Sequence, residues 1–274
     1  MLPFIHGVAE TYIDNERDLL PQCCFVFPNK RSATFFHHAY ARACNEKGLQ
    51  LIHPATVTIS DFILEMAHTV EPDRMEKIFL LYDAYCEIIR ENVRRDIKPE
   101  KLKSLLDFNH FLRWADMILG DFNDVDMYCV DPESIFLNVK RYKEISTNYV
   151  SADVMAEIQK HWKTSAGRYS TLDDRFWNHI GQGDGDAAQT ADFFRMWQIL
   201  LPLYRRFNEK LDSKGMSYNG KAYLRAIGYI DSTAAEDLPY RRYVFMGFNM
   251  ISDAEEKVFA LLRDKQAPVP LADF

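Results

Sequence analysis

Apolar positions near the start of the chain follow first a helical and then a strand-like pattern. Residues 3–15 carry Phe4 and Val8 at helical spacing, so we predict an amphipathic helix there. The apolar run Cys23–Phe27 is short, aromatic and followed by Pro28, which is typical of a buried strand. The chain is therefore predicted to open with a helix that leads into a strand.

The next stretch continues this alternation. Ser32 is the predicted N-cap of a helix that ends at Gly48, and Ser60 and Asp61 are predicted to cap the helix after it. The predicted elements of this stretch are a helix over 33–47 and strands over 49–53 and 55–59.

From residue 60 to 228 the periodicity is helical and strand signals are almost absent. The predicted helices cover 60–69, 74–96, 99–120, 132–144, 151–165, 190–213 and 218–228. Gly181–Gln189 is rich in Gly and Asp and is the best candidate for a mobile loop. A strand returns within Tyr240–Phe248, and a helix over 253–264 follows it.

These patterns predict an α/β fold with a large all-α insertion, mostly helical overall. We assign residues 1–59 and 236–274 to an incomplete α/β core and residues 60–235 to a helical insertion subdomain. The order helix, strand, helix, strand implies parallel pairing, and ligands of such sheets bind at the carboxyl ends of the strands.

Composition narrows the class of protein. The chain has 274 residues, of which 47% are hydrophobic and 14% aromatic, so it can form a core and is not a disordered chain. No apolar run approaches the ~18 residues that a membrane span needs. The first residues lack the basic and apolar regions of a secretory signal, so we expect a cytoplasmic protein that does not bind membranes.

Charge and cysteines exclude further classes. The formal net charge of −7 argues against a protein that binds nucleic acid through bulk charge, although it leaves room for a local basic surface. The five cysteines show no spacing that suits zinc, so we predict reduced thiols in the core.

Two motifs resemble ligand sites. Gly215–Lys221 fits GxxxxGK, but a helix is predicted before it and Ala222 replaces the Ser or Thr that would hold Mg²⁺, so a helix C-cap followed by a turn is favoured. An acidic cluster is predicted after a helix, where capping is favoured over cation binding, with Asp131 as an N-cap. The cluster comprises Asp121, Asp124, Asp126 and Asp131.

Other catalytic chemistry has no support in the residues. Asp131-Pro132-Glu133 lacks the following strand that a PD-(D/E)xK nuclease site needs. His37 and His38 have no HExxH partner, and no pattern for a nucleophilic serine or cysteine is present.

A polar, basic segment directly after the first predicted strand is more informative. Asn29, Lys30 and Arg31 follow that strand and open a helix, which is a geometry suited to phosphate, and a solvated turn explains the segment equally well. Thr58 and Ser60 end a neighbouring strand, where their hydroxyls would add contacts to a sugar-phosphate backbone. Thr56 is a further hydroxyl candidate on that strand.

Six phrases of the sequence, taken in order, resemble the N-terminal part of a bacterial family. They are FVFPNKRSATFF, TISDFI, WADMILGDFNDVD, MWQILLPLYRRF, GMSYNGKAY and VFMGFNMISDAEEKVF. The family is that of AddB/RecB-like proteins of the Bacteroidetes type, which carry a PD-(D/E)XK nuclease domain at their far C-terminus. The resemblance covers about residues 3–265.

The resemblance implies an incomplete P-loop-helicase-like domain of the UvrD class, interrupted by a helical subdomain. The FPNKR and TISDF segments correspond to places where such helicases contact single-stranded DNA, which implies DNA contacts at Asn29, Lys30, Arg31, Thr58 and Ser60. The helicase motor itself looks inactivated. No Walker A loop precedes FPNKR, and the place of the Walker B acids is taken by Met-Gly-Phe.

The expected function is that of a non-catalytic, DNA-contacting part of a recombination and DNA-repair exonuclease. No activity and no cofactor are expected in these residues, and Mg²⁺ is expected only in a nuclease domain beyond them. The expected partners are single-stranded or duplex-end DNA, the C-terminal remainder of the protein and an AddA-like helicase subunit. Alternatives are an interaction scaffold without DNA contact and a small-molecule enzyme that uses GxxxxGK.

Overall fold

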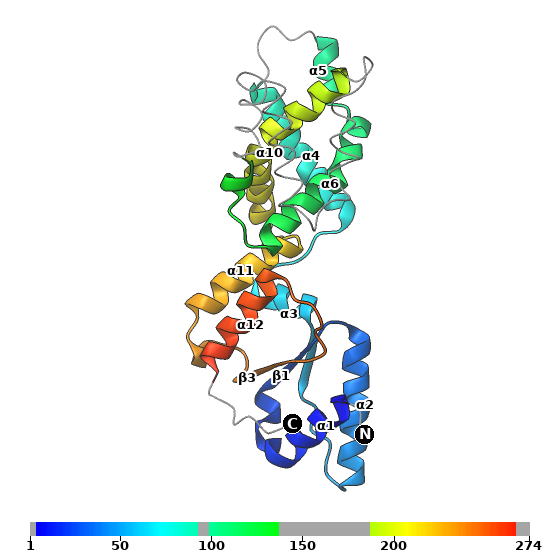
Figure 1. The fold of residues 1–274 in the computed structure, drawn as a ribbon, viewed down its shortest axis with the longest axis vertical. Coiled ribbons are helices and arrows are strands. Elements are labelled where there is room, and N and C mark those ends of the chain that lie inside the picture. The colour runs from blue at the N-terminus through cyan, green and yellow to red at the C-terminus, as the bar shows by residue number, and fades with distance from the viewer. Residues whose placement is uncertain (1–3, 93–98, 137–186, 267–274) are drawn as a thin grey trace, which may run out of the picture. The chain divides into compact units, whose positions relative to one another are not determined.

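The computed structural model describes residues 4–92, 99–136 and 187–266. Helices and three short strands alternate at the start and the end of the chain, with helices between (Figure 1). The first elements are α1 (Phe4–Asn15), η1 (Arg17–Gln22), β1 (Cys23–Phe27), α2 (Lys30–Glu46), β2 (Ala55–Thr58), α3 (Ile59–Met66) and α4 (Arg74–Asn92). They are followed by α5 (Pro99–Leu105), α6 (Phe108–Met127), α10 (Ala187–Ser213), α11 (Asn219–Ser232), η2 (Ala235–Asp237), β3 (Arg242–Phe245) and α12 (Asp253–Lys265).

Backbone proximity divides the chain into two compact units. Unit 1 contains the sheet and comprises residues 1–77, 116–129 and 211–274. Unit 2 is helical and comprises residues 78–115 and 130–210. The boundaries fall inside α4, α6 and α10, so each of these helices contributes to both units.

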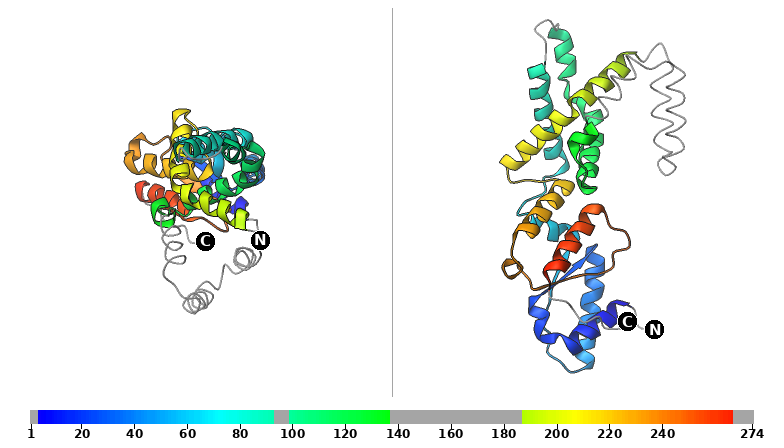
Figure 2. Two further views of the ribbon diagram at one scale, coloured as in Figure 1. Left: turned by 90° about the horizontal axis from the view of Figure 1, so that it is seen from above. Right: turned by 60° about the vertical axis from the view of Figure 1, so that its left-hand side comes forward.

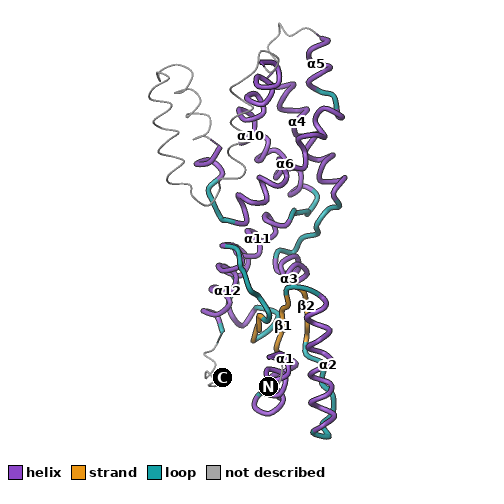
Figure 3. The backbone as a smooth tube through the Cα atoms, turned by 45° about the vertical axis from the view of Figure 1, so that its right-hand side comes forward, coloured by secondary structure: helices purple, strands orange, loops and turns teal. Residues whose placement is uncertain are grey.

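The sheet of unit 1 has three parallel strands in the order β2-β1-β3. Side chains of β1 alternate between its two faces, and all five are buried. Cys23, Phe25 and Phe27 pack with α1 and α2, whereas Cys24 and Val26 pack with α3, α11 and α12. This three-layer arrangement explains why β1 is apolar throughout, as strands covered on both faces are (Figure 3).

Aromatic side chains form much of the first face. Phe36 of α2 is 0% exposed and lies between Phe25 and Phe27, with ring centroids 4.7 and 5.4 Å away. Tyr40 stacks on the same ring from the next turn of α2. The apolar stripe of α2 therefore packs this helix against the sheet.

The second face is covered by α3 and by α11 and α12, which pack side by side (Figure 2). Phe62 of α3 meets Tyr243 and Phe245 of β3 edge to face, at centroid distances of 5.6 and 5.8 Å. Ser252 and Glu255 form a capping box that begins α12 at the end of the β3 loop.

Unit 2 combines an aromatic cluster with ion pairs. Phe111 of α6 contacts Tyr82 and Tyr85 of α4, with ring centroids 5.4 and 4.7 Å apart. Both tyrosine hydroxyls donate to backbone carbonyls at the end of α5, so their polar ends are satisfied.

The structure confirms an α/β layer whose two parts are separated by a large helical segment. The predicted strand over 49–53 is wrong, because this segment forms no ladder and only leads into β2. The predicted helix over 99–120 is two helices, separated at Leu106 and Asp107, and the second continues to Met127. The predicted helix over 151–165 lies outside the described residues.

The compact units do not follow the sequence-based boundaries at residues 59 and 236. Residues 60–77, 116–129 and 211–235 belong to unit 1, whereas the sequence pattern assigns them to the insertion. The physical reason is that a sheet must bury both faces, and α3 and α11 cover the second one.

The predicted core thiols are observed. All five cysteines are free, and four of them are buried. Burial raises the pKa of Cys23 to about 11 and that of Cys24 to about 12, which keeps these thiols protonated.

Candidate functional site

The carboxyl edge of the sheet gathers the segments that the sequence pointed to. Phe27 at the end of β1 pairs with Thr58 at the end of β2, and Val26 pairs with Phe245 at the end of β3. The three connections that follow these strands therefore start within one or two residues of each other along this edge. We call the surface formed by these connections the carboxyl edge.

The crossover direction of the chain reverses at β1. The chain reaches β2 through α2 on one face of the sheet, and it returns past β1 to β3 with helices on the other face. The ends of β1 and β3 thus flank a topological switch point, which is where open α/β sheets bind ligands. At this point Gly247 has a φ of +80°, and a Cβ on it would lie 3.8 Å from Pro28 Cδ.

The α2 helix begins three residues earlier than predicted, with Asn29 rather than Ser32 as its N-cap. The Asn29 side chain accepts a hydrogen bond from the Ser32 N–H at 3.0 Å. Lys30 and Arg31 consequently lie in the first helical turn, not in a turn before it. The first N–H groups of a helix have no partner within the helix, and its dipole favours an anion at that end.

Both basic side chains of this turn are exposed. Within residues 4–92, 99–136 and 187–266, neither Lys30 nor Arg31 forms an ion pair. Two unpaired positive charges therefore stand beside the first N–H groups of α2, where the sequence predicted a phosphate contact. This arrangement can attract an anion without breaking an existing ion pair.

The three hydroxyl groups predicted to contact a sugar-phosphate backbone have different hydrogen-bond partners and exposure. Thr58 is the N-cap of α3: its hydroxyl accepts from the Asp61 N–H at 3.2 Å and donates to the Asp61 carboxylate at 2.7 Å. Ser60, a predicted cap, instead lies exposed in the first turn of α3. Thr56 bonds to His37 Nε2 at 2.8 Å, so its hydroxyl joins β2 to α2.

The charges of the carboxyl edge are not uniform. The basic residues come from α2, whereas α3 contributes Asp61 and the first turn of α12 contributes Asp253, Glu255 and Glu256. Burial, together with the neighbouring His53 and His38, lowers the pKa of His37, so this ring adds no positive charge near neutral pH. The basic part of the edge is therefore the start of α2.

The GxxxxGK segment has an architectural role in the structure. Gly215 has a φ of +67° and ends α10, while the N–H groups of Gly215 and Met216 donate to Asp212 and Leu211 carbonyls as in a Schellman motif. Lys221 is 8% exposed and pairs with Asp212 at 2.9 Å. The favoured C-cap is confirmed, and the lysine points to a carboxylate of its own unit.

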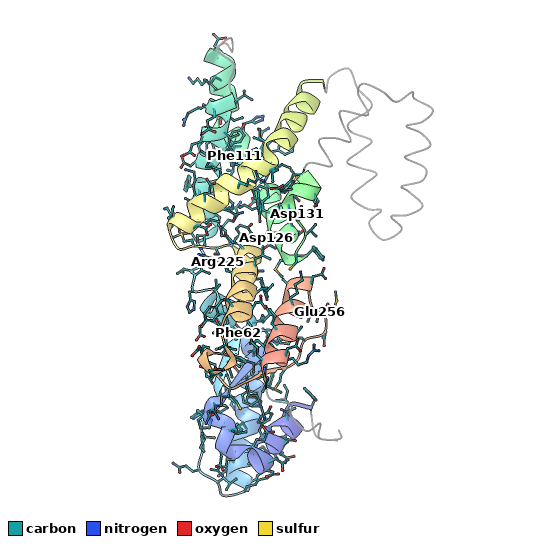
Figure 4. All side chains as sticks on the ribbon, turned by 90° about the vertical axis from the view of Figure 1, so that its left-hand side faces the viewer. Phe62, Phe111, Asp126, Asp131, Arg225 and Glu256 are labelled. Carbon is teal, nitrogen blue, oxygen red and sulfur yellow. The ribbon has the colours of Figure 1, made fainter. Side chains whose placement is uncertain are left out.

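Three aspartates of the acidic cluster lie inside α6, because that helix continues to Met127 and does not end before them. Asp126 is buried and accepts a hydrogen bond from the Tyr218 hydroxyl at 2.5 Å (Figure 4). Asp131 caps the following helical turn by accepting from the Ser134 N–H at 3.0 Å, as predicted. Among the described residues, no group of three or more His, Cys, Asp or Glu side chains is arranged to hold a metal ion.

Two further pairs of adjacent arginines occur, Arg205-Arg206 and Arg241-Arg242, and three of these four residues have acidic partners in their own units. Arg205 pairs with Glu133, and Arg206 pairs with Glu87 and Glu91. Arg242 pairs with Glu16. These contacts distinguish such residues from Lys30 and Arg31.

Comparisons with known proteins do not assign the chain to a family. A scan against known protein families finds no match, and a search of curated proteins finds no match either. Among the described residues, no helix is long and apolar enough to cross a membrane.

Proposed function

We propose that the carboxyl edge contacts the phosphate backbone of DNA, as part of a helicase-like domain without motor activity. The observation that carries this proposal is a pair of exposed basic side chains in the first turn of α2, at the switch point of the sheet. Lys30 and Arg31 have no ion-pair partner in the part of the chain that the structure describes. Positive side chains and free helix N–H groups are the usual partners of nucleic-acid phosphates.

The layout of the chain supports the helicase-like part of the proposal. Parallel strands with helices on both faces, separated by a large helical segment, are what the resemblance to AddB-like proteins implies. A UvrD-type origin with a lost ATP site accounts for this layout. The full protein would be a recombination and repair exonuclease that acts with an AddA-like subunit and uses Mg²⁺ in its nuclease domain.

Binding should be modest and sensitive to salt. The chain as a whole carries a net charge of −7, and acidic residues of α3 and α12 share the carboxyl edge. At this edge, the start of α2 is the part whose positive charge attracts phosphates, so few phosphates can be neutralised at once.

The test is titration of a fluorescent single-stranded oligonucleotide at several salt concentrations. The variant K30A/R31A should weaken binding and reduce the slope of log K against log salt by about 1.4, at about 0.7 per phosphate neutralised. The control R241A/R263A removes two exposed arginines: Arg241 precedes β3 at the opposite end of the strand, and Arg263 pairs only with Asp264 among the described residues. It should bind like the unmodified chain.

An interaction scaffold without DNA contact is the second candidate. Met250 is 91% exposed and Ile251 is 46% exposed in the connection between β3 and α12, so an apolar partner surface lies at the same edge. This candidate predicts no DNA binding at low salt, or equal binding by K30A/R31A and the unmodified chain. Either result would overturn the proposal of DNA contact.

A further inference from the structure

Two adjacent phenylalanines of α2 have opposite environments. Phe36 is 0% exposed within the core, whereas Phe35 is 59% exposed. A single exposed aromatic residue is common on protein surfaces, so by itself it does not indicate a binding site. The residues near Phe35 on the same helix have to be considered with it.

Phe35 lies in an exposed stripe of α2 that also contains basic residues. Arg31, Phe35 and His38 are spaced by four and three residues, which places them on the same face of the helix. All three are exposed. Arg42 continues the stripe, although it is paired with Glu46.

The stripe is free of acidic residues. No Asp or Glu occurs between Lys30 and Asn45, in a chain whose net charge is −7. Glu46, the next acid along α2, pairs with Arg42, and Asp61 at the start of α3 bonds to Thr58. The exposed face of α2 is therefore a local surface of positive charge with one aromatic ring in it.

We infer that this face of α2 binds unpaired bases, with Phe35 as the residue on which a base stacks. The inference rests on the proposed function, because Lys30 and Arg31 would hold the phosphates next to that base. Basic side chains that alternate with an exposed ring are the elements of single-strand binding surfaces, on which the π-face of any base can stack. Bases within a duplex are already stacked on each other, so the face would prefer single strands.

Three probes separate stacking from charge: oligothymidine, an abasic oligonucleotide of the same length and a duplex. With the full chain, F35A should weaken oligothymidine binding about five-fold or more and leave the salt slope unchanged, since stacking releases no counterion. It should leave binding of the abasic strand unchanged. The F35Y variant keeps a ring and should bind normally.

The matched control is F4A, because Phe4 is 66% exposed on α1 of the same unit. Equal losses in F35A and F4A, or an equal loss by F35A on the abasic strand, would overturn the inference. The inference would also be overturned if F35A bound oligothymidine as tightly as the unmodified chain while K30A/R31A bound it weakly. That result would still support the proposed function. Failure of the unmodified chain to bind any probe at low salt would overturn both proposals.

Discussion

Basic side chains of α10 in unit 2 and of α2 in unit 1 have different surroundings. In unit 2, Arg206 and Lys210 of α10 lie between carboxylates of α4, with Lys210 Nζ 2.5 Å from Asp83 and 2.7 Å from Glu87. In unit 1, Lys30 and Arg31 are exposed and have no ion-pair partner among the described residues. The same residue types thus join two helices at the first place and remain available to an external anion at the second.

This difference extends to how each unit is stabilised. Unit 1 relies on apolar contacts across both faces of β1. Unit 2 adds charged contacts between helices to its aromatic cluster. Substitutions that separate core contacts from surface charges should therefore affect the units unequally.

The largest expected effect comes from the core of unit 1. Phe36→Ala should lower the free energy of unfolding by about 3–5 kcal/mol, because it empties the space between Phe25 and Phe27. Phe35→Ala, one residue away, should change it by less than about 0.5 kcal/mol. Denaturant titrations of both variants measure the contrast, and similar losses would show that Phe35 is not a surface residue in solution.

A smaller effect is expected where α11 approaches α6. A Cβ on Gly220 would lie 2.6 Å from the Asn123 carbonyl oxygen, so Gly220→Ala should destabilise unit 1 by about 1–3 kcal/mol. A Cβ on Gly228, in the same helix, would meet no atom within 4 Å, so Gly228→Ala should stabilise by about 0.4–1 kcal/mol. Thermal unfolding tests both, and a neutral Gly220→Ala would contradict the close approach of the two helices.

Much of the secondary structure of unit 1 could be predicted, because the sequence patterns that indicate it are local. The run Cys23–Phe27 is apolar at every position because both of its faces are buried, and this is visible in the sequence. The separate strand predicted over 49–53 is absent: Leu49–His53 has strand-like residues but pairs with no strand, because pairing is decided by distant segments. The compact units also divide the chain differently from the sequence pattern, since cover of a sheet face is a nonlocal property.

The structure places the predicted contact residues at the ends of β1 and β2, but their local geometry differs from what the sequence suggested. Asn29 and Ser32 are both good N-caps, so propensity alone does not select Asn29, and the choice moves Lys30 and Arg31 into the helix. An N-cap threonine followed three residues later by an acid is a known pattern at helix starts, and it occurs at Thr58 and Asp61. This pattern could have shown that the Thr58 hydroxyl caps α3. Extending the helix back to Lys30 would also have placed Phe35 on the face of Arg31.

The smallest expected effect concerns the ion pairs of unit 2. Lys210 and Arg206 lower the pKa of Glu87, so the folded state binds a proton there less readily than the unfolded chain does. The stabilisation is therefore present above the ordinary glutamate pKa of about 4.3 and is lost as pH falls through the lower folded value. Glu87→Gln should cost about 0.2–1 kcal/mol at pH 7, and this difference should shrink toward acid pH and at high salt.

Amide hydrogen exchange over α4 and α10 localises that cost to unit 2. The K30A/R31A variant is the matched control, because it removes charges that pair with none of the described residues and should leave exchange throughout unit 1 unchanged. Faster exchange around α2 in K30A/R31A would show that these two side chains contribute to folding. The contrast between paired and available basic residues, on which the proposed DNA contact depends, would then be lost.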